Sequence, residues 1–286
     1  MPLTRDSKFD SARDLFQEIN RKALANELGG TSEECLINSL KILRKGESSI
    51  EHALSKFITN DPRMLAMKAR ISLIFPRPEP VLITGPTGVG KELLAKALTR
   101  SGEPFVSENC AGIPEALVES IFFGHVKGAF TGAHEDKRGL LEEAGEGIIF
   151  LDEIGDMPMN LQAKFLRAIQ ENEIRRVGST NTVDLHCRFV AATKYDLESR
   201  MESGHFREDL FARLMTYQIK VTPLMERTPD IELITKSMIP NGKLDDLIEA
   251  KLWPFPEFIM EKIRRFNVRG IETALARRIS YGSYDE

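Results

Sequence analysis

The sequence predicts an α/β fold, in which short buried strands alternate with amphipathic helices, and three observations support this. From Val81 onward, short apolar runs alternate with longer segments of helical periodicity. A glycine-rich loop, Gly85–Lys91, follows the first apolar run and leads into a helical pattern. A later apolar run, Ile148–Leu151, ends in the adjacent carboxylates Asp152 and Glu153. These features predict a central sheet flanked by helical segments.

The segment before the sheet, residues 1–60, is predicted to be helical. Its leucines and isoleucines have loosely helical spacing, and Gly29-Gly30 separates two such runs. Thr31 is a candidate N-cap for the second run, with Glu34 completing a capping box. A proline-dense linker, Phe75–Pro80, then leads into the first strand. The sequence leaves the role of residues 1–60 open.

Five apolar runs are the candidate strands of the domain that we expect over residues 61–228. They are Val81–Thr84, Phe105-Val106, Ile148–Leu151, Phe189–Ala192 and Ile219–Val221. Between them, one face of an amphipathic helix is marked by Leu161, Phe165, Ala168 and Ile169. Short helical elements punctuated by prolines follow Pro223, which predicts a small helical lid over residues 229–286.

The glycine-rich loop has the pattern G-x-x-x-x-G-K between a strand and a helix. It consists of Gly85, Pro86, Thr87, Gly88, Val89, Gly90 and Lys91, with Glu92 following. Glycines let backbone N–H groups face phosphate oxygens, and the lysine neutralises the β- and γ-phosphates. The alternative, an ordinary glycine-rich turn, explains neither the preceding strand nor the following helix. We therefore expect nucleotide phosphates to bind here.

The carboxylates Asp152 and Glu153 are predicted to have different tasks. Adjacent residues at the end of a strand point in different directions. Asp152 is the candidate ligand for Mg²⁺, through its hydration shell, and Glu153 is the candidate general base for an attacking water. The alternative is two solvated acids at a strand end, which the nearby phosphate loop makes less favourable.

The composition excludes several classes of protein. Of 286 residues, 29% are charged and 42% apolar, and the net charge is −4, which argues against strong non-specific binding of nucleic acid. Cys35, Cys110 and Cys187 lack C-x-x-C spacing, so neither a disulfide framework nor a zinc site is indicated. No apolar run approaches the roughly 18 residues of a membrane span. We expect a soluble cytoplasmic protein without membrane contact.

A hexapeptide places an aromatic side chain between two glycines. It consists of Gly128, Ala129, Phe130, Thr131, Gly132 and Ala133. Glycines permit a tight loop, so we expect Phe130 at an exposed tip, where an apolar side chain indicates a binding partner. The alternative for any one of these residues is an ordinary surface turn.

The hexapeptide GAFTGA resembles the signature loop of the sigma-54-dependent transcriptional activators, a branch of the AAA+ ATPases. The similarity extends from about Pro80 to Ile231 and includes GIIFLDEIGDMP and LQAKFLRAIQENEIRRVG. It implies a P-loop AAA+ core with a five-stranded parallel sheet between helices, followed by a small helical lid. It also implies ATP and Mg²⁺ as cofactors, assembly into a homo-oligomeric ring such as a hexamer, and contact of the loop with the sigma-54 factor of the RNA polymerase holoenzyme.

The resemblance also implies roles for single residues. Glu92 stands where other P-loops have Ser or Thr, and GKE is the ordinary form in this family. Arg207 and Arg213, six positions apart, match the paired arginine fingers that reach the nucleotide of a neighbouring subunit. By themselves, both would be surface ion-pair partners.

Three further positions match the family less completely. Asn109 stands where the family has an asparagine that bonds the catalytic glutamate; by itself, it is a turn residue. Thr193 ends a strand where the family reads Ala-Ala-Thr-Asn, but Lys194 replaces the asparagine. Arg269 resembles the nucleotide-sensing arginine of the lid, although Gly270 replaces the glutamate that usually follows, and an ordinary surface arginine is the alternative.

The chain lacks the length for two domains that family members commonly carry. Residues 1–60 are too short for a receiver domain, and no C-terminal DNA-binding domain is expected after the lid. Direct sequence-specific DNA binding by this chain is therefore not expected. A regulatory protein is a further candidate partner.

Three functions follow from these expectations. The favoured one is a ring-forming ATPase that remodels sigma-54 RNA polymerase so that the promoter opens. The second, suggested by Lys194 and the altered lid, is a nucleotide-binding regulatory or interaction protein with little turnover. The third is an AAA+ remodeler of another protein. Measurement of ATP turnover separates the first two, and removal of Phe130 separates the first from the third.

Overall fold

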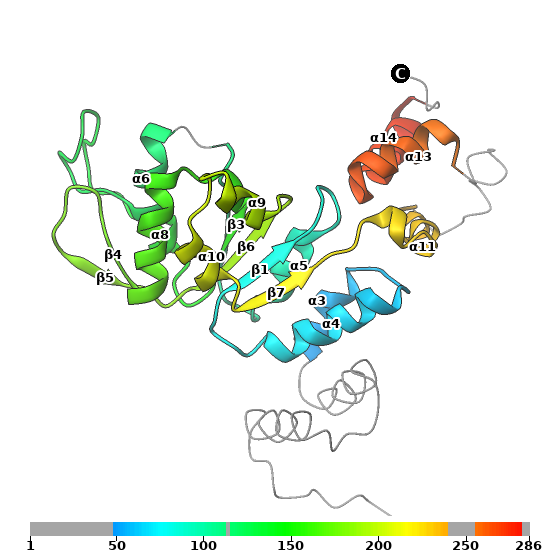
Figure 1. Ribbon diagram of the computed structural model, residues 1–286, viewed down its shortest axis with the longest axis horizontal. Coiled ribbons are helices and arrows are strands. Elements are labelled where there is room, and N and C mark those ends of the chain that lie inside the picture. The colour runs from blue at the N-terminus through cyan, green and yellow to red at the C-terminus, as the bar shows by residue number, and fades with distance from the viewer. Residues whose placement is uncertain (1–47, 113–114, 240–254, 282–286) are drawn as a thin grey trace, which may run out of the picture.

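The computed structural model describes residues 48–112, 115–239 and 255–281 (Figure 1). Its centre is a parallel five-stranded sheet with the order β2-β3-β6-β1-β7. The strands are β1 (Val81–Thr84), β2 (Phe105–Asn109), β3 (Ile148–Asp152), β6 (Arg188–Thr193) and β7 (Tyr217–Lys220). The predicted α/β fold is confirmed, and each predicted strand overlaps one of these five. The helical prediction for residues 1–47 lies outside the described residues.

Helices cover both faces of the sheet, because its strands are apolar on both sides. They are α3 (Ser48–Ser55), α4 (Pro62–Ile74), α5 (Lys91–Ala97), α6 (Glu115–Phe123), α7 (Leu140–Glu143), α8 (Met159–Glu171), α9 (Leu197–Glu202) and α10 (Glu208–Leu214). Within β1, Leu82 packs into the cluster with α6, α8 and α10, whereas Val81 and Ile83 pack with α3, α4 and α5. This alternation places the sheet between two separate apolar cores.

Helix α8 confirms the predicted amphipathic pattern. Leu161, Phe165 and Ala168 are buried, and Ile169 packs at the edge of the same cluster. Phe165 makes edge-to-face contacts with Phe122 and other rings of this core. This packing anchors α6, the helix that precedes the GAFTGA loop.

The lid consists of α11 (Pro229–Met238), α13 (Glu257–Phe266) and α14 (Val268–Tyr281), which follow the short helix η2 (Leu224–Glu226). These helices share an apolar cluster of their own and lie beyond the end of the sheet (Figure 1). A second short helix, η1 (Ile154–Asp156), follows β3, and a hairpin of β4 (Glu173–Arg175) and β5 (Thr182–Asp184) follows α8. None of the described helices is long and apolar enough to cross a membrane.

A buried arginine fastens the start of β6 to the segment before β1. The Arg188 guanidinium donates to the carbonyl oxygens of Ile74, Phe75 and Glu79 at 2.9, 3.1 and 3.0 Å. Burial lowers the pKa of Arg188 to about 10. The predicted proline-dense linker, Phe75–Pro80, is therefore tied to the sheet by its main chain.

Candidate functional site

Several residues that the sequence predicts to be functional lie at the carboxyl edge of the sheet. Asn109 at the end of β2 is the register partner of Asp152 at the end of β3. Thr193 at the end of β6 pairs with Thr84, directly before the phosphate loop. Parallel strands present their carboxyl ends at one edge, and ligands of open α/β sheets bind there.

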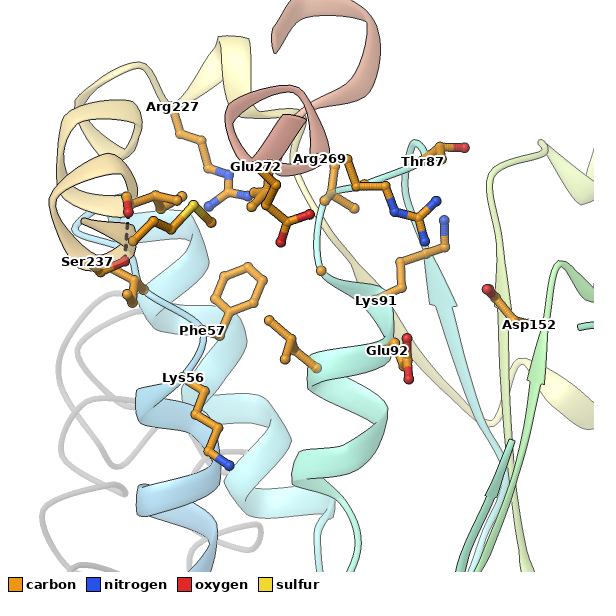
Figure 2. A pocket seen from close by; sticks show the side chains of 18 of the residues that line it. Lys56, Phe57, Thr87, Lys91, Glu92, Asp152, Arg227, Ser237, Arg269 and Glu272 are labelled. Atoms are coloured by element: carbon orange, nitrogen blue, oxygen red, sulfur yellow. Dashed lines mark hydrogen bonds between the residues drawn. The ribbon is translucent and has the colours of Figure 1, made fainter. Parts of the chain in front are cut away.

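A cavity of about 440 Å³ lies between this edge, the phosphate loop and the lid (Figure 2). Its volume is within the usual range for small-molecule sites. Of the residues predicted from the sequence, it is lined by Thr87, Gly88, Val89, Gly90, Lys91, Glu92, Asn109, Asp152, Glu153 and Arg269. Residues absent from those predictions also line it: Lys56, Phe57, Ile58, Leu93, Arg227, Ile234, Ser237, Met238, Val268 and Glu272.

The phosphate loop presents backbone donors to the cavity. Gly88 and Gly90 have φ values of 77° and 102°, which favour glycine. A Cβ atom at Gly88 would lie 2.1 Å from the carbonyl oxygen of Phe266, so the lid leaves no room for a side chain there. Within the described structure, the N–H groups of residues 87–90 donate no hydrogen bond. Unpaired N–H groups of this kind form a cradle for anions.

The Lys91 side chain extends back along the phosphate loop. Its Nζ atom donates to the carbonyl oxygens of Gly85 and Pro86 at 2.9 and 3.3 Å, and it lies 3.8 Å from Oε1 of Glu153. Burial lowers the pKa of Lys91, while the carboxylates of Glu153 and Asp152 oppose that shift. Gly85 and Pro86 do not line the cavity themselves, but they position the lysine.

The two carboxylates at the end of β3 occupy different surroundings, as the sequence predicts. Asp152 lines the cavity, and its Oδ1 atom accepts from the N–H of Glu153 at 3.1 Å. Glu153 has a left-handed backbone with φ of 51° and is buried. A non-glycine residue in this conformation is uncommon and frequent at functional sites.

The carboxylate of Glu153 contacts Lys194 instead of Asn109. Its Oε2 atom accepts from the backbone N–H of Lys194 at 3.1 Å and lies 4.0 Å from the Lys194 ammonium. Asn109 accepts from the N–H of Ala111 at 2.9 Å, and no hydrogen bond joins it to Glu153 within the described ranges. The expected Asn109–Glu153 bond is therefore absent from this arrangement.

Lys194 lies at the position where the resemblance implies an asparagine. Its ammonium lies 3.7 Å from Asp156 and above the ring of Tyr195. Partial burial acts to lower the pKa of Lys194, but Tyr195 and the nearby carboxylates raise it overall. Thr193 is fully buried and accepts from the N–H of Tyr195, so it does not line the cavity.

Arg269 enters the cavity from α14, and Figure 2 shows its guanidinium on the side of Lys91. The start of α14 is joined to the phosphate loop. Val268 donates its N–H to the carbonyl oxygen of Gly88 at 3.0 Å, and the Asn267 amide donates to that of Thr87 at 3.0 Å. The lid and the loop thus share main-chain contacts.

Arg207 and Arg213 lie outside the cavity, at the two ends of α10. Arg213 is exposed, and Arg207 pairs with Asp209 through hydrogen bonds of 3.0 and 2.7 Å. Their assignment as arginine fingers stays a prediction.

The GAFTGA loop is a compact turn that exposes Phe130. Gly128 and Gly132 have positive φ values, and the N–H of Gly128 donates to the carbonyl oxygen of Ala133 at 2.8 Å. Phe130 is 39% exposed and packs edge-on against the ring of His125 at 5.0 Å. The loop between α6 and α7 lies at the end of the molecule opposite the lid (Figure 1).

The described residues contain no group of three His, Cys, Asp or Glu side chains that could hold a metal ion by themselves. Magnesium fits this site in another way, since it usually takes one or two carboxylates together with phosphate oxygens and water. Asp152 lines the same cavity as the phosphate loop, which is the arrangement that such a shared site requires.

Comparison with known proteins identifies related sequences. Residues 57–220 match the family described as the Sigma-54 interaction domain. The response regulator PilR of Pseudomonas aeruginosa is 38% identical over 87% of this chain and 57% of its own length. The regulatory protein AtoC of Escherichia coli is 42% identical over 70% of this chain and 46% of its own. The chain spans about half the length of the curated relatives it matches first.

Solved structures agree with this relationship. NtrX from Brucella abortus in complex with ATP has a TM-score of 0.66 and 28% identity, covering 91% of this chain and 61% of NtrX. The Saccharomyces cerevisiae Hsp104–ADP complex has a TM-score of 0.52 and 16% identity, covering 90% of this chain and 50% of Hsp104. The second likeness concerns the fold alone and agrees with an AAA+ architecture.

Proposed function

Because the chain belongs to the family of proteins with a sigma-54 interaction domain, we propose that it hydrolyses ATP and uses this energy to remodel sigma-54 RNA polymerase for promoter opening. The observation that carries the proposal is the joint presence of Lys91, Asp152 and Glu153 in one cavity with a phosphate loop. The exposed Phe130 in a turn of the expected composition supports the choice of partner.

The residues divide the chemistry as follows. The free N–H groups of residues 87–90 and the Lys91 ammonium would bind the phosphates, and Asp152 would hold Mg²⁺ through its hydration shell. Bound Mg²⁺ supplies neutralisation of charge on the phosphate oxygens. Glu153 accepts a proton from water as the water oxygen bonds to the γ-phosphorus and the bond to ADP breaks. Arg207 and Arg213 serve the neighbouring subunit of a ring, hexameric in the favoured form.

The first test replaces the proposed base. Glu153→Gln retains the size of the side chain but cannot accept the proton, so we expect turnover to fall by about 10²- to 10⁴-fold while ATP still binds. Steady-state phosphate release and equilibrium ATP binding measure the two effects. Turnover at the wild-type rate in this variant would remove Glu153 from the mechanism.

The partner is tested by replacing the tip of the loop. Phe130→Ala is expected to keep ATP turnover but to lose co-purification with sigma-54 in the presence of an ADP–metal-fluoride complex. Leu65→Ala is the matched control, since Leu65 on α4 is similarly exposed, at 45% against 39%. If the wild-type protein binds no sigma-54 under any nucleotide condition, the remodeler of another protein becomes the better proposal.

A second candidate function rests on the contacts of Lys194. Its main-chain N–H bonds Glu153 and its ammonium lies near that carboxylate, which favours a nucleotide-binding protein with little turnover. Such a protein would act as a regulatory partner of an active ATPase. Tight ATP binding without phosphate release at any protein concentration would favour this candidate.

A further inference from the structure

Glu272 on α14 is a carboxylate of the cavity that the proposed mechanism does not use. It lines the cavity and is exposed, so a molecule in the cavity can reach it. Asp152 and Glu153, which line the same cavity, already have proposed tasks. Glu92, the fourth carboxylate of the lining, pairs with Lys96 at 2.7 Å. Across the described ranges, the Glu272 side chain takes part in no hydrogen bond or ion pair, so both of its oxygens are free to accept from a ligand.

The helical period turns Glu272 toward the cavity. Ile271 and Leu275, four positions apart on α14, are buried in the apolar core of the lid. Arg269 and Glu272, three positions apart, lie together on another face of the helix, and both line the cavity. The packing of the lid core therefore determines which side chains of α14 face the nucleotide site.

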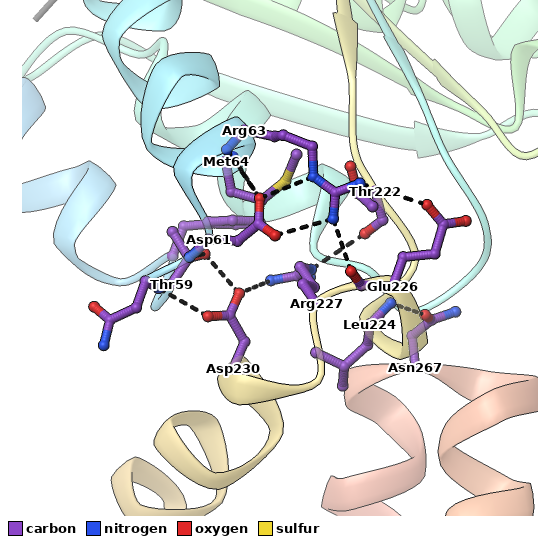
Figure 3. A network of polar contacts seen from close by, with 12 residues as sticks. Thr59, Asp61, Arg63, Met64, Thr222, Leu224, Glu226, Arg227, Asp230 and Asn267 are labelled. Carbon is purple, nitrogen blue, oxygen red and sulfur yellow. Dashed lines mark hydrogen bonds and ion pairs between the residues drawn. The ribbon is translucent and has the colours of Figure 1, made fainter.

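Buried polar contacts hold the lid in this position (Figure 3). Oδ2 of Asp230 accepts from Nη1 of Arg227 at 3.0 Å and from the Thr59 hydroxyl at 2.6 Å. Oδ1 of Asp230 accepts from the N–H of Asn60 at 2.8 Å. Arg227 is 1% exposed and also donates to the carbonyl oxygen of Thr222 at 3.2 Å. Because α11 and α14 share one apolar core, these contacts join α14 as well to the segment before α4.

The distance of Glu272 from the phosphate loop follows from the helix. At the start of α14, the N–H of Val268 donates to the carbonyl oxygen of Gly88 in the loop at 3.0 Å. Glu272 lies four residues further along, about 6 Å along the helix axis. Its carboxylate is therefore displaced from the phosphate site by about one helical turn.

The wall beyond this carboxylate suits a flat apolar base. The apolar side chains that line it are Phe57, Ile58, Ile234 and Met238. In the view of Figure 2, the Glu272 carboxylate lies between Phe57 on one side and Lys91 on the other. A nucleotide with its phosphates at Lys91 and its base on the apolar wall would bring its ribose to Glu272.

The charge of Glu272 limits which part of a nucleotide can face it. An ionised carboxylate repels phosphate oxygens and accepts hydrogen bonds without donating any. The donors of ATP that lie nearest to its phosphates are the 2′- and 3′-hydroxyls of the ribose. Acidic side chains bind ribose hydroxyls in this way in dinucleotide-binding folds.

We propose that the Glu272 carboxylate accepts hydrogen bonds from the 2′- and 3′-hydroxyls of the ribose and thereby selects ATP over deoxynucleotides. This inference rests on the proposed binding of ATP. Hydrogen bonds to a charged group are stronger than those between neutral groups, so loss of both hydroxyls should weaken binding by about 10- to 100-fold.

The test compares equilibrium binding of ATP and of 2′,3′-dideoxy-ATP. In the wild-type protein, the dideoxy analogue is expected to bind about 10- to 100-fold more weakly. In Glu272→Ala, the two affinities should lie within about threefold of each other, since the acceptor is lost. Both ligands carry the same triphosphate, so removal of the Glu272 charge affects them equally and their ratio isolates the hydroxyls.

Glu261→Ala is the matched control. Glu261 on α13 is likewise an exposed glutamate of the lid, but it pairs with Arg264 and does not line the cavity. This variant should keep the wild-type ratio of affinities. Circular dichroism checks the fold of each variant. Glu272→Gln, which removes the charge and keeps the size of the side chain, is the second variant and should also lower the ratio.

The outcomes separate this proposal from the proposed function. Equal binding of ATP and dideoxy-ATP by the wild-type protein would overturn the role of Glu272, as would the wild-type ratio in both Glu272 variants. Inosine triphosphate lacks the amino donor of adenine; if Glu272→Ala changes only the preference for ATP over this ligand, Glu272 faces the base and the ribose assignment is wrong. Inorganic tripolyphosphate binds the loop without a nucleoside, and protein that binds neither it nor ATP would overturn the proposed function.

Discussion

At the scale of single residues, Asn267 connects three parts of the chain. Its backbone has φ of 54° and ψ of −129°, a combination that lies outside the left-handed helical region and that residues other than glycine rarely adopt. Its side-chain oxygen accepts from the N–H of Leu224 at 2.7 Å, and its amide donates to Thr87 in the phosphate loop. Asn267 therefore positions the lid, the segment after β7 and the loop against one another.

We expect Asn267→Ala to lower the free energy of unfolding by about 2 kcal/mol, because it leaves the buried N–H of Leu224 unpaired and retains positive φ without a local bond. Urea denaturation measures the change. Asn267→Asp is the control, since it keeps the acceptor for Leu224 but loses the donor to Thr87. An unchanged unfolding midpoint in Asn267→Ala would contradict this account.

The sequence predicted the phosphate loop and the carboxylates because each is a local pattern next to a strand. Phe57, Arg227 and Asn267 carry no such pattern. The bond from Asn267 to Thr87 spans 180 residues, and that from Thr59 to Asp230 spans 171. Their roles arise when the lid folds back on the phosphate loop, and a linear sequence does not display such contacts.

At the scale of elements, the sequence predicts the strands that consist of apolar runs, but it does not predict short strands that contain polar residues. The β4–β5 hairpin was not predicted because its strands have three residues each, and only Ile174 among these six residues is buried. The three inner strands of the sheet, β3, β6 and β1, are buried on both faces, so their apolar runs are conspicuous.

Helix α4 begins after a capping residue, Asp61, that the sequence analysis did not single out. The Asp61 carboxylate accepts from the N–H groups of Arg63 and Met64 at 2.9 and 3.3 Å. The Arg63 side chain lowers the pKa of Asp61, with the two backbone bonds assisting and partial burial opposing. A carboxyl group whose pKa is lowered in the folded state contributes stability above its unfolded pKa.

We expect Asp61→Ala to lower the free energy of unfolding by about 1 kcal/mol at pH 7, through loss of the cap. The difference from wild type should shrink as the pH falls below about 4, where the carboxylate of the folded protein becomes protonated. Asp61→Asn keeps a capping oxygen without the charge and should show a smaller loss. Thermal unfolding across pH 2.5 to 7 tests the trend, at roughly the range in which Asp titrates. A difference independent of pH would contradict it.

At the scale of the whole molecule, the proposed catalytic groups divide between separate surfaces. Lys91, Asp152 and Glu153 line the cavity, whereas Arg207 and Arg213 lie on α10 outside it. If the arginines act on a neighbour, activity depends on assembly, and two different inactive variants can complement each other. This arrangement distinguishes a ring from a self-sufficient monomer.

An equimolar mixture of Glu153→Gln and Arg213→Ala is expected to recover about a quarter of the wild-type rate, because random assembly brings an intact Glu153 to an intact Arg213 at that fraction of interfaces. Each variant alone should be nearly inactive. Phosphate release from the mixture, compared with each variant at the same total concentration, is the measurement. No recovery in a mixture that forms mixed oligomers would place the arginines in another role.

The hydrogen bonds of Arg188 bear on which recombinant fragments of the protein can fold. In the part of the chain that the structure describes, the Arg188 guanidinium donates no hydrogen bond to a carboxylate. Its acceptors are the carbonyl oxygens of Ile74, Phe75 and Glu79. A recombinant fragment that starts at Val81 would keep every strand and the entire phosphate loop, yet it would remove all three carbonyl acceptors of this guanidinium. The smallest fragment that folds therefore extends upstream of the nucleotide motifs to include the end of α4.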